Sequence, residues 1–269
     1  MLVPPVLLDV RPALEQDASA VAVITLNDPD HRNVLSAGLV AALIEVMDTV
    51  ESDLGIGAIV VTGAPPAFCA GADLGSLAGE SSRASQGDSG VEGGLRAIYE
   101  GFLRVARSPL PTVAAVNGPA VGAGMNLALA CDVRVCGRSA RFDTRFLDLG
   151  LHPGGGHTFM LQRIAGPEVA AAMVLFGQRY DGQAAVGRGL AYSCVDDNAL
   201  LDEAIALAAR AASMPRALSV RVKATMASAA ALDDHSAAVD AELEAQMWSL
   251  GQPFFAERLA KLRAKVSGR

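Results

Sequence analysis

Apolar residues in the first half of the chain form short runs rich in Val, Ile and Ala, separated by stretches with helical spacing. Four runs have the length of buried strands, and they cover residues 21–26, 58–62, 112–116 and 132–135. Between the first two, apolar residues recur at helical spacing over 39–50, and Ser36 is placed to cap that helix. Another helix is expected to begin near Gly122. This alternation predicts an α/β protein.

The pattern changes further along the chain. Residues 75–94 are rich in Gly, Ser, Asp and Glu with little periodicity, which predicts a long mobile loop near the mouth of a site. A helix over 95–106 follows and ends before Pro109. Beyond residue 156 helical spacing dominates, and helices are predicted over 167–176, 198–212, 215–229 and 234–250. The chain thus divides into a core of ββα units over 1–195 and a helical region over 196–269 of the same functional domain.

Composition excludes several classes of protein. Hydrophobic residues make up 51% and charged residues 19%, so a large buried core is expected. The net charge is −7 and no Lys/Arg cluster stands out, which argues against nucleic acid as the main partner. We expect no membrane span and a cytoplasmic location, because there is no long uncharged apolar run and no signal-like N-terminus. The irregularly spaced cysteines are predicted to be buried free thiols: Cys69, Cys131, Cys136 and Cys194.

Two short stretches, residues 67–74 and 117–127, carry the candidate chemistry. Each follows an apolar β-branched run and is crowded with Gly and Ala, so its backbone N–H groups are open to a ligand. Two N–H groups that face one point form an oxyanion hole, with donors roughly 2.7–3.1 Å from a carbonyl oxygen. These stretches therefore favour a site that stabilises negative charge on oxygen.

The two stretches, in this order and spacing, resemble the enoyl-CoA hydratase/isomerase family of the crotonase superfamily. The likeness runs from residues 26–33 to the C-terminal helices. It implies an α/β crotonase-like (ClpP/crotonase) spiral of ββα units, with a C-terminal helical trimerisation region that forms a homotrimer or a dimer of trimers. It also implies acyl-CoA or enoyl-CoA as substrate, in fatty acid metabolism. Coenzyme A is then part of the substrate, and no separate cofactor or metal is expected.

The resemblance assigns roles to particular residues. Ala72 and Ala123 match the two backbone oxyanion-hole donors, and Ala123 stands where many members have glycine. Its extra methyl group does not remove the N–H, and a helix N-terminus there favours negative charge. Phe255 and Arg258 resemble a pair that reaches the CoA of a neighbouring subunit. The other positions expected to bind substrate or CoA are Arg32, Val34, Ala70, Gly71, Asp73, Leu74, Gly122, Asn126 and Phe146.

The chain departs from the family at the acid–base positions. Hydratases of the family use two glutamates, and Asn126 and Phe146 occupy the matching positions here. An amide and a phenyl ring have no useful basicity, and each acid–base group contributes roughly 10²–10⁴-fold, so hydration is expected to be very slow. The leading replacements are Asp148, two residues beyond Phe146 on a segment expected to be extended, and His152. The further candidates are Asp143 and His157.

Three functions remain open from the sequence. The first is an isomerase or another enolate-forming enzyme with a non-standard acid or base. The second is an acyl-CoA carrier or sensor without catalysis. The third is a dinucleotide-binding oxidoreductase, because residues 122–128 loosely match a glycine fingerprint with Asp143 about 20 residues on. The five residues 117–121 between strand and first glycine weigh against the third reading, because the fingerprint places its turn directly after the strand.

Overall fold

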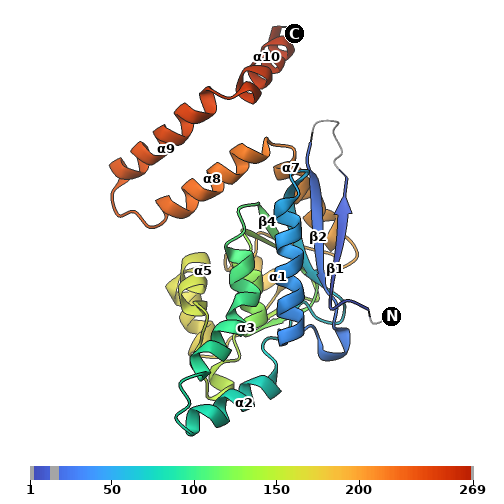
Figure 1. The fold of residues 1–269 in the computed structure, drawn as a ribbon, viewed down its shortest axis with the longest axis vertical. Helices are drawn as coiled ribbons and strands as arrows, with labels where there is room; N and C mark the ends of the chain where they lie inside the picture. Colours follow the sequence, from blue (N-terminus) through green and yellow to red (C-terminus); the bar gives the residue numbers. More distant parts are fainter. Residues whose placement is uncertain (1–2, 13–17, 268–269) are drawn as a thin grey trace.

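The computed structural model describes residues 3–12 and 18–267. A twisted sheet forms its centre, and helices cover both of its faces (Figure 1). The six strands, in their order across the sheet, are β1 (Val6–Arg11), β2 (Ala20–Leu26), β3 (Ile56–Gly63), β4 (Thr112–Val116), β6 (Val133–Gly137) and β9 (Ser193–Val195). β1 runs antiparallel to β2, and the other neighbours are parallel. All positions of β3 and β4 are buried, as expected for parallel strands covered on both faces.

A second, smaller sheet lies beside the first. Its strands, in order, are β5 (Pro119–Val121), β7 (Arg141–Asp143) and β8 (Tyr180–Asp181). β5 occupies most of the gap between β4 and the glycine turn at Gly122, so no turn directly follows β4. The geometry of a dinucleotide fingerprint is therefore not formed.

Seven helices of the described residues precede the C-terminal tail. They are α1 (Ala37–Ser52), α2 (Leu74–Ser85), α3 (Val91–Ala106), α4 (Ala123–Ala130), α5 (His157–Val174), α6 (Gly182–Gly187) and α7 (Leu200–Ala212). Side chains of α1, α3 and α4 pack against one face of the large sheet in the main core. On the other face α7 packs through Ala204, Ala208 and Ala212, whose four-residue spacing puts them on one side of the helix.

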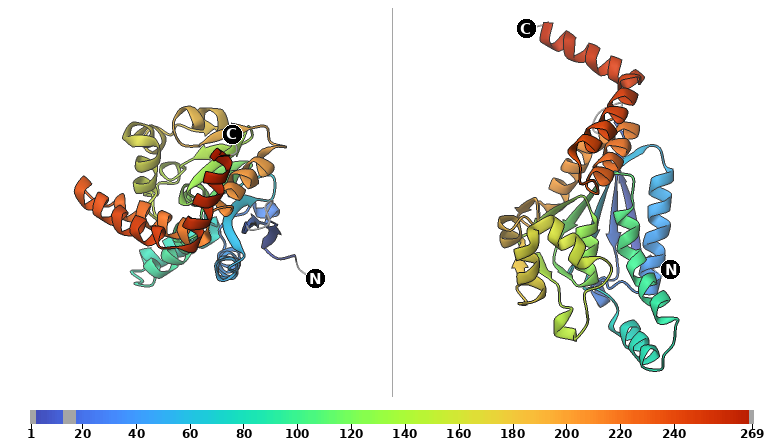
Figure 2. Two further views of the ribbon diagram at one scale, coloured as in Figure 1. Left: turned by 90° about the horizontal axis from the view of Figure 1, so that it is seen from above. Right: turned by 90° about the vertical axis from the view of Figure 1, so that its left-hand side faces the viewer.

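Three further helices form the C-terminal tail: α8 (Arg216–Ala229), α9 (His235–Leu250) and α10 (Pro253–Ser267). They extend away from the sheet, and α10 lies at the far end of the molecule (Figures 1 and 2). None of their described residues is buried, and large apolar side chains such as Met226, Met247 and Val266 are more than 60% exposed. The part that stands apart from the core begins with α8, because α7 packs on the sheet.

The main predicted elements are confirmed within a few residues, including the Ser36 cap, whose oxygen accepts a hydrogen bond from the Leu39 N–H. The predicted loop over 75–94 is wrong, because α2 and the start of α3 occupy it. Asp73 caps α2 by accepting from the Ser76 N–H at 2.7 Å, and Arg83 pairs with Glu80 one turn away. No residue of α2 is buried, so the apolar periodicity that reveals most helices is weak there. The predicted position of this segment beside the site is confirmed, since its residue Leu77 lines the cavity.

Some elements of the structure were missed or misplaced in the sequence-based prediction. β1 and the second sheet were not predicted, and α5 begins ten residues before its predicted start. α5 consists of two helical segments joined at Gly166, whose φ of 84° interrupts the helix just before Pro167. The four cysteines are free thiols as predicted; three are buried and Cys194 is partly exposed. Among the described residues, no helix combines the length and apolarity needed to cross a membrane.

Candidate active site

The two glycine- and alanine-rich stretches lie side by side beyond the carboxyl ends of β3 and β4. Cys69 forms a parallel bridge with Ala120, and the Val121 N–H donates to the Cys69 carbonyl oxygen at 3.0 Å. On the other side, the Leu35 N–H donates to the Gly71 carbonyl oxygen at 2.8 Å. These bonds fix both stretches at the edge of the sheet where ligands of α/β proteins commonly bind.

Small residues are required where the stretches meet. Gly71 has a φ of +107°, and a Cβ atom there would lie 2.8 Å from the Val121 carbonyl oxygen. A Cβ atom on Gly124 would overlap the Cys69 carbonyl oxygen. The two backbones can approach this closely only because both positions are glycine.

The Ala72 and Ala123 amides are the predicted donors of an oxyanion hole. Ala123 is the first residue of α4, so its N–H has no partner within the helix. In the described part of the chain, neither amide donates a hydrogen bond to any other group. A Cβ atom on Gly71, next to Ala72, would lie 3.8 Å from the Ala123 nitrogen, and both alanines line one cavity. The structure therefore brings the predicted donors together with their N–H groups available.

That cavity has a volume of about 670 Å³. The residues predicted from the sequence that line it are Arg32, Val34, Ala70, Gly71, Ala72, Asp73, Leu74, Gly122, Ala123, Asn126, Phe146 and His152. Lining residues that sequence reasoning missed include His31, Leu95, Ile98, Tyr99 and Arg145. Leu95, Ile98 and Tyr99 lie at helical spacing on α3, and that spacing is the signal that could have assigned them to one wall.

Phe255 and Arg258 do not line this cavity. Both belong to α10, and the Arg258 guanidinium donates to the Ser213 carbonyl oxygen at 2.7 Å. Their proposed contact with CoA in a neighbouring subunit concerns a second chain, so it stays a prediction.

The structure separates the two leading acid–base candidates. Residues 147–149 form a 3₁₀ helix and not the expected extended segment, so the two-residue step from Phe146 turns Asp148 away from the cavity. The Asp148 carboxylate pairs with Arg179 at 2.9 Å and is absent from the cavity wall. His152 does line the cavity.

The orientation of the His152 ring defines its chemistry. Its Nδ1 lies 2.7 Å from the Pro153 carbonyl oxygen, which can only accept a hydrogen bond. Nδ1 therefore carries the proton in the neutral ring, and Nε2 has a free lone pair. His152 is exposed, so its side chain is accessible to a ligand. Of the two leading candidates, the geometry favours His152.

Asn126, Phe146 and His157 form a cluster in and behind the cavity wall. The Asn126 amide nitrogen donates to the Gly154 carbonyl oxygen at 3.1 Å, and its oxygen lies 2.6 Å from His157 Nδ1. The Phe146 and His157 rings meet edge-on, with centroids 4.9 Å apart. His157 is buried behind the wall, and burial lowers its pKa to about 4. The remaining candidate, Asp143, is also buried, and its carboxylate pairs with Arg145 at 2.6 Å and Arg179 at 3.1 Å.

The buried imidazole of His157 predicts a loss of stability in mild acid. Its folded pKa of about 4 lies below its unfolded value of 6.5, so the unfolded chain binds more protons between these limits. Stability should therefore fall as the pH drops below 6.5, by about 2 kcal/mol from this residue between pH 7 and 5. Urea unfolding at both pH values should show a smaller fall in His157→Gln. The raised pKa of His31, which its hydrogen bond to Asp28 causes, acts in the opposite direction in both proteins. An equal fall in the two would contradict the prediction.

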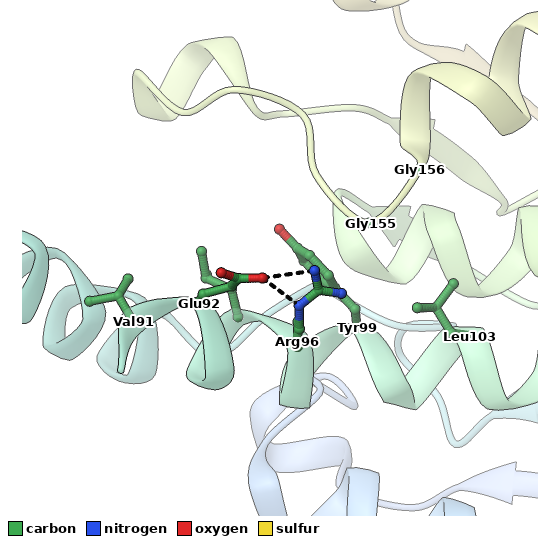
Figure 3. A pocket seen from close by; sticks show the side chains of 8 residues that line it. Val91, Glu92, Arg96, Tyr99, Leu103, Gly155 and Gly156 are labelled. Carbon is green, nitrogen blue, oxygen red and sulfur yellow. Dashed lines mark hydrogen bonds and ion pairs between the residues drawn. The ribbon is translucent and has the colours of Figure 1, made fainter. Parts of the chain in front are cut away.

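A second hollow, also of about 670 Å³, adjoins the cavity along α3. Leu95 and Tyr99 line both spaces. Figure 3 shows the exposed ion pair between Arg96 and Glu92, 2.7 Å apart, on the α3 side of this hollow. The space beyond the main cavity thus continues along one face of α3.

The chain is similar to known proteins over most of its length. The family model described as enoyl-CoA hydratase/isomerase matches residues 16–252. A Mycobacterium tuberculosis protein named "Probable enoyl-CoA hydratase" is 49% identical over 245 residues, which are 89% of this chain and 93% of that protein. The 1,2-epoxyphenylacetyl-CoA isomerase of Escherichia coli is 36% identical over 72% of this chain and 74% of its own.

Solved structures agree with this match. The crystal structure of an enoyl-CoA hydratase from Mycobacterium smegmatis superposes with a TM-score of 0.86 at 29% identity, and the match covers 98% of this chain and 97% of the other. The fold predicted from the sequence is therefore confirmed as crotonase-like. Taken with the family-model match, these similarities show that the chain belongs to the enoyl-CoA hydratase/isomerase family.

Proposed function

We propose that this chain is an enzyme that binds acyl-CoA thioesters and stabilises their enolates between the Ala72 and Ala123 amides. The observation that carries the proposal is a pair of N–H groups at one cavity that have no partner among the residues the structure describes. Preorganised donors of this kind stabilise negative charge that develops on a carbonyl oxygen. Relatives named as hydratases and as an isomerase of CoA esters support this class of substrate.

His152 is the proposed base. Its Nε2 takes a proton from C2 of the acyl group, and the C–H electron pair forms a C1–C2 double bond. The carbonyl π electrons move onto the thioester oxygen, where the two amides stabilise the charge. Return of the proton to C2, after its replacement by a deuteron from heavy water, gives deuterium exchange. With an unsaturated acyl group, its return to C4 gives isomerisation. Water addition is disfavoured, because Asn126 and Phe146 supply neither the base nor the acid that the family's two glutamates supply for hydration.

Deuterium exchange at C2 of butyryl-CoA tests this proposal. His152→Ala should lower the exchange rate by roughly 10²–10⁴-fold, because a positioned base contributes about that much. Asp148→Asn is the matched control, since Asp148 lies outside the cavity wall. Its rate should stay close to that of the unmodified chain. Normal exchange in His152→Ala, with a slow rate in Asp148→Asn, would refute the assignment.

A carrier or sensor is the second candidate. Asn126 and Phe146 favour it, because these two residues, at the positions that resemble those of the family's catalytic glutamates, line the cavity without a carboxylate. Micromolar binding of acyl-CoA without any exchange or turnover would support a carrier in place of the enzyme.

We also propose that α8, α9 and α10 mediate assembly into a homotrimer or a dimer of trimers. These helices have no buried residue in the single chain, yet they carry many exposed apolar side chains. Burying such a surface against another copy is favourable. Light scattering should give three or six times the chain mass; a monomer would contradict the proposal.

A further inference from the structure

The side chain of Asn126 has more hydrogen-bonding capacity than the described residues use. A side-chain amide has two N–H donors and one acceptor oxygen. One donor binds the Gly154 carbonyl oxygen at 3.1 Å, and the oxygen faces His157 Nδ1 at 2.6 Å. In the described part of the chain, the second donor has no partner. Asn126 borders the cavity, so this donor is available to a ligand.

The amide cannot turn to offer its oxygen instead. Rotation would place the Asn126 oxygen against the Gly154 carbonyl oxygen, which cannot donate. The same constraint fixes the proton of the neutral His157 ring on Nδ1, where it binds the Asn126 oxygen. His157 is thus a positioning residue, which holds Asn126 as a donor towards the cavity.

Asn126 also stands close to the oxyanion hole. It lies three residues after Ala123 on α4, so the two residues share a face of the helix. A thioester whose oxygen binds the Ala123 N–H would place its next carbon atoms near Asn126. Phe146, which lines the same wall, offers no hydrogen-bond acceptor.

We propose that Asn126 selects acyl-CoA thioesters that carry a carbonyl oxygen on C3, that is, 3-oxoacyl-CoA. A ketone oxygen only accepts hydrogen bonds, and it matches a site that offers a fixed donor beside an aromatic ring. A C3 hydroxyl fits less well, because its own proton would need an acceptor. The two carbonyls flanking C2 also make its proton far more acidic, which suits a site whose candidate base is one imidazole, His152. This inference rests on the proposed thioester site, and it assigns that site a substrate class.

Calorimetry with three ligands of equal chain length tests the proposal: acetoacetyl-CoA, 3-hydroxybutyryl-CoA and butyryl-CoA. The unmodified chain should bind acetoacetyl-CoA roughly five- to tenfold more tightly than butyryl-CoA, the value of one added hydrogen bond. The affinity for 3-hydroxybutyryl-CoA should equal that for butyryl-CoA or lie between the affinities for butyryl-CoA and acetoacetyl-CoA. Equal affinity for acetoacetyl-CoA and butyryl-CoA, or a preference for the hydroxy ester, would overturn the proposal.

Variants separate recognition from a structural role. Asn126→Leu should remove the preference for acetoacetyl-CoA, measured as the ratio of its affinity to that for butyryl-CoA in the same variant. His157→Gln, whose amide can also donate to Asn126, should retain more of the preference than His157→Phe does. A preference that persists in Asn126→Leu would refute the assignment. If Asn126→Leu fails to fold, the three-ligand comparison in the unmodified chain still decides.

The ligand preference measured by calorimetry is independent of the rate measured in the deuterium-exchange assay. Exchange on butyryl-CoA without any ligand preference would support the proposed function and refute this inference. A clear preference for acetoacetyl-CoA without deuterium exchange on butyryl-CoA would support this inference and refute the proposed enzyme.

Discussion

Ala123→Pro should lower the rate of C2 deuterium exchange on butyryl-CoA by roughly 10²–10³-fold. That range is the usual effect of removing one oxyanion-hole donor. Proline has no N–H, so the substitution deletes the proposed donor directly. Ala123 is the first residue of α4, where proline is well tolerated because its fixed φ suits the first turn. The helix should therefore persist while the hole loses one of its two donors.

Ala123→Gly is the matched control for this experiment. It removes the methyl group but keeps the N–H, so exchange should remain within a few-fold of the unmodified rate. Circular dichroism and thermal melting of both variants check that the fold is retained. A folded Ala123→Pro variant with normal exchange would show that this amide does not bind the thioester oxygen.

The sequence predicts best those parts of the fold where one physical signal dominates. β3 and β4 are buried on both faces, so they appear as continuous apolar runs. β8 and β7 have only two and three residues, which is too short for any period to appear. α2 buries no residue, and its helix depends on the Asp73 cap and on charged side chains of its exposed face.

In the candidate site, too, some features follow from a sequence motif and others depend on the three-dimensional structure. The position of Ala72 and Ala123 at one cavity was predictable, because it depends on the backbone of the two glycine-rich stretches and not on side-chain direction. The choice between Asp148 and His152 depended on local conformation, and the 3₁₀ turn at 147–149 reverses the expectation for an extended segment. The contact between Asn126 and His157 joins residues 31 positions apart, and no local pattern encodes it.

Asn33 is a further residue whose role is visible only in three dimensions. It is fully buried, and its side-chain amide donates to the Ala64 and Ala67 carbonyl oxygens at 2.8 Å each. Its oxygen accepts from the Asp28 N–H at 2.9 Å. These bonds anchor the loop that leads into Ala72, so the position of the proposed oxyanion-hole donor depends on a buried polar group well outside its motif.

Gly124→Ala should destabilise the fold by about 3 kcal/mol, at the upper end of the usual cost of overpacking. The added methyl group would overlap the Cys69 carbonyl oxygen, which belongs to the backbone and cannot rotate away. The overlap should push residues 69–72 away from α4, so exchange should also fall at temperatures where the variant remains folded. Urea unfolding and the exchange assay measure the two effects.

Gly38→Ala, the same chemical change on α1, provides the contrast. A Cβ atom on Gly38 would have no neighbour within 4 Å, and alanine has the higher helix propensity. This variant should be unchanged or more stable by up to about 1 kcal/mol, with normal exchange. If Gly124→Ala behaved like Gly38→Ala, the two stretches would not need their close approach. The hole formed by Ala72 and Ala123 would then lose its structural basis, because that approach is what brings the two amides to one cavity.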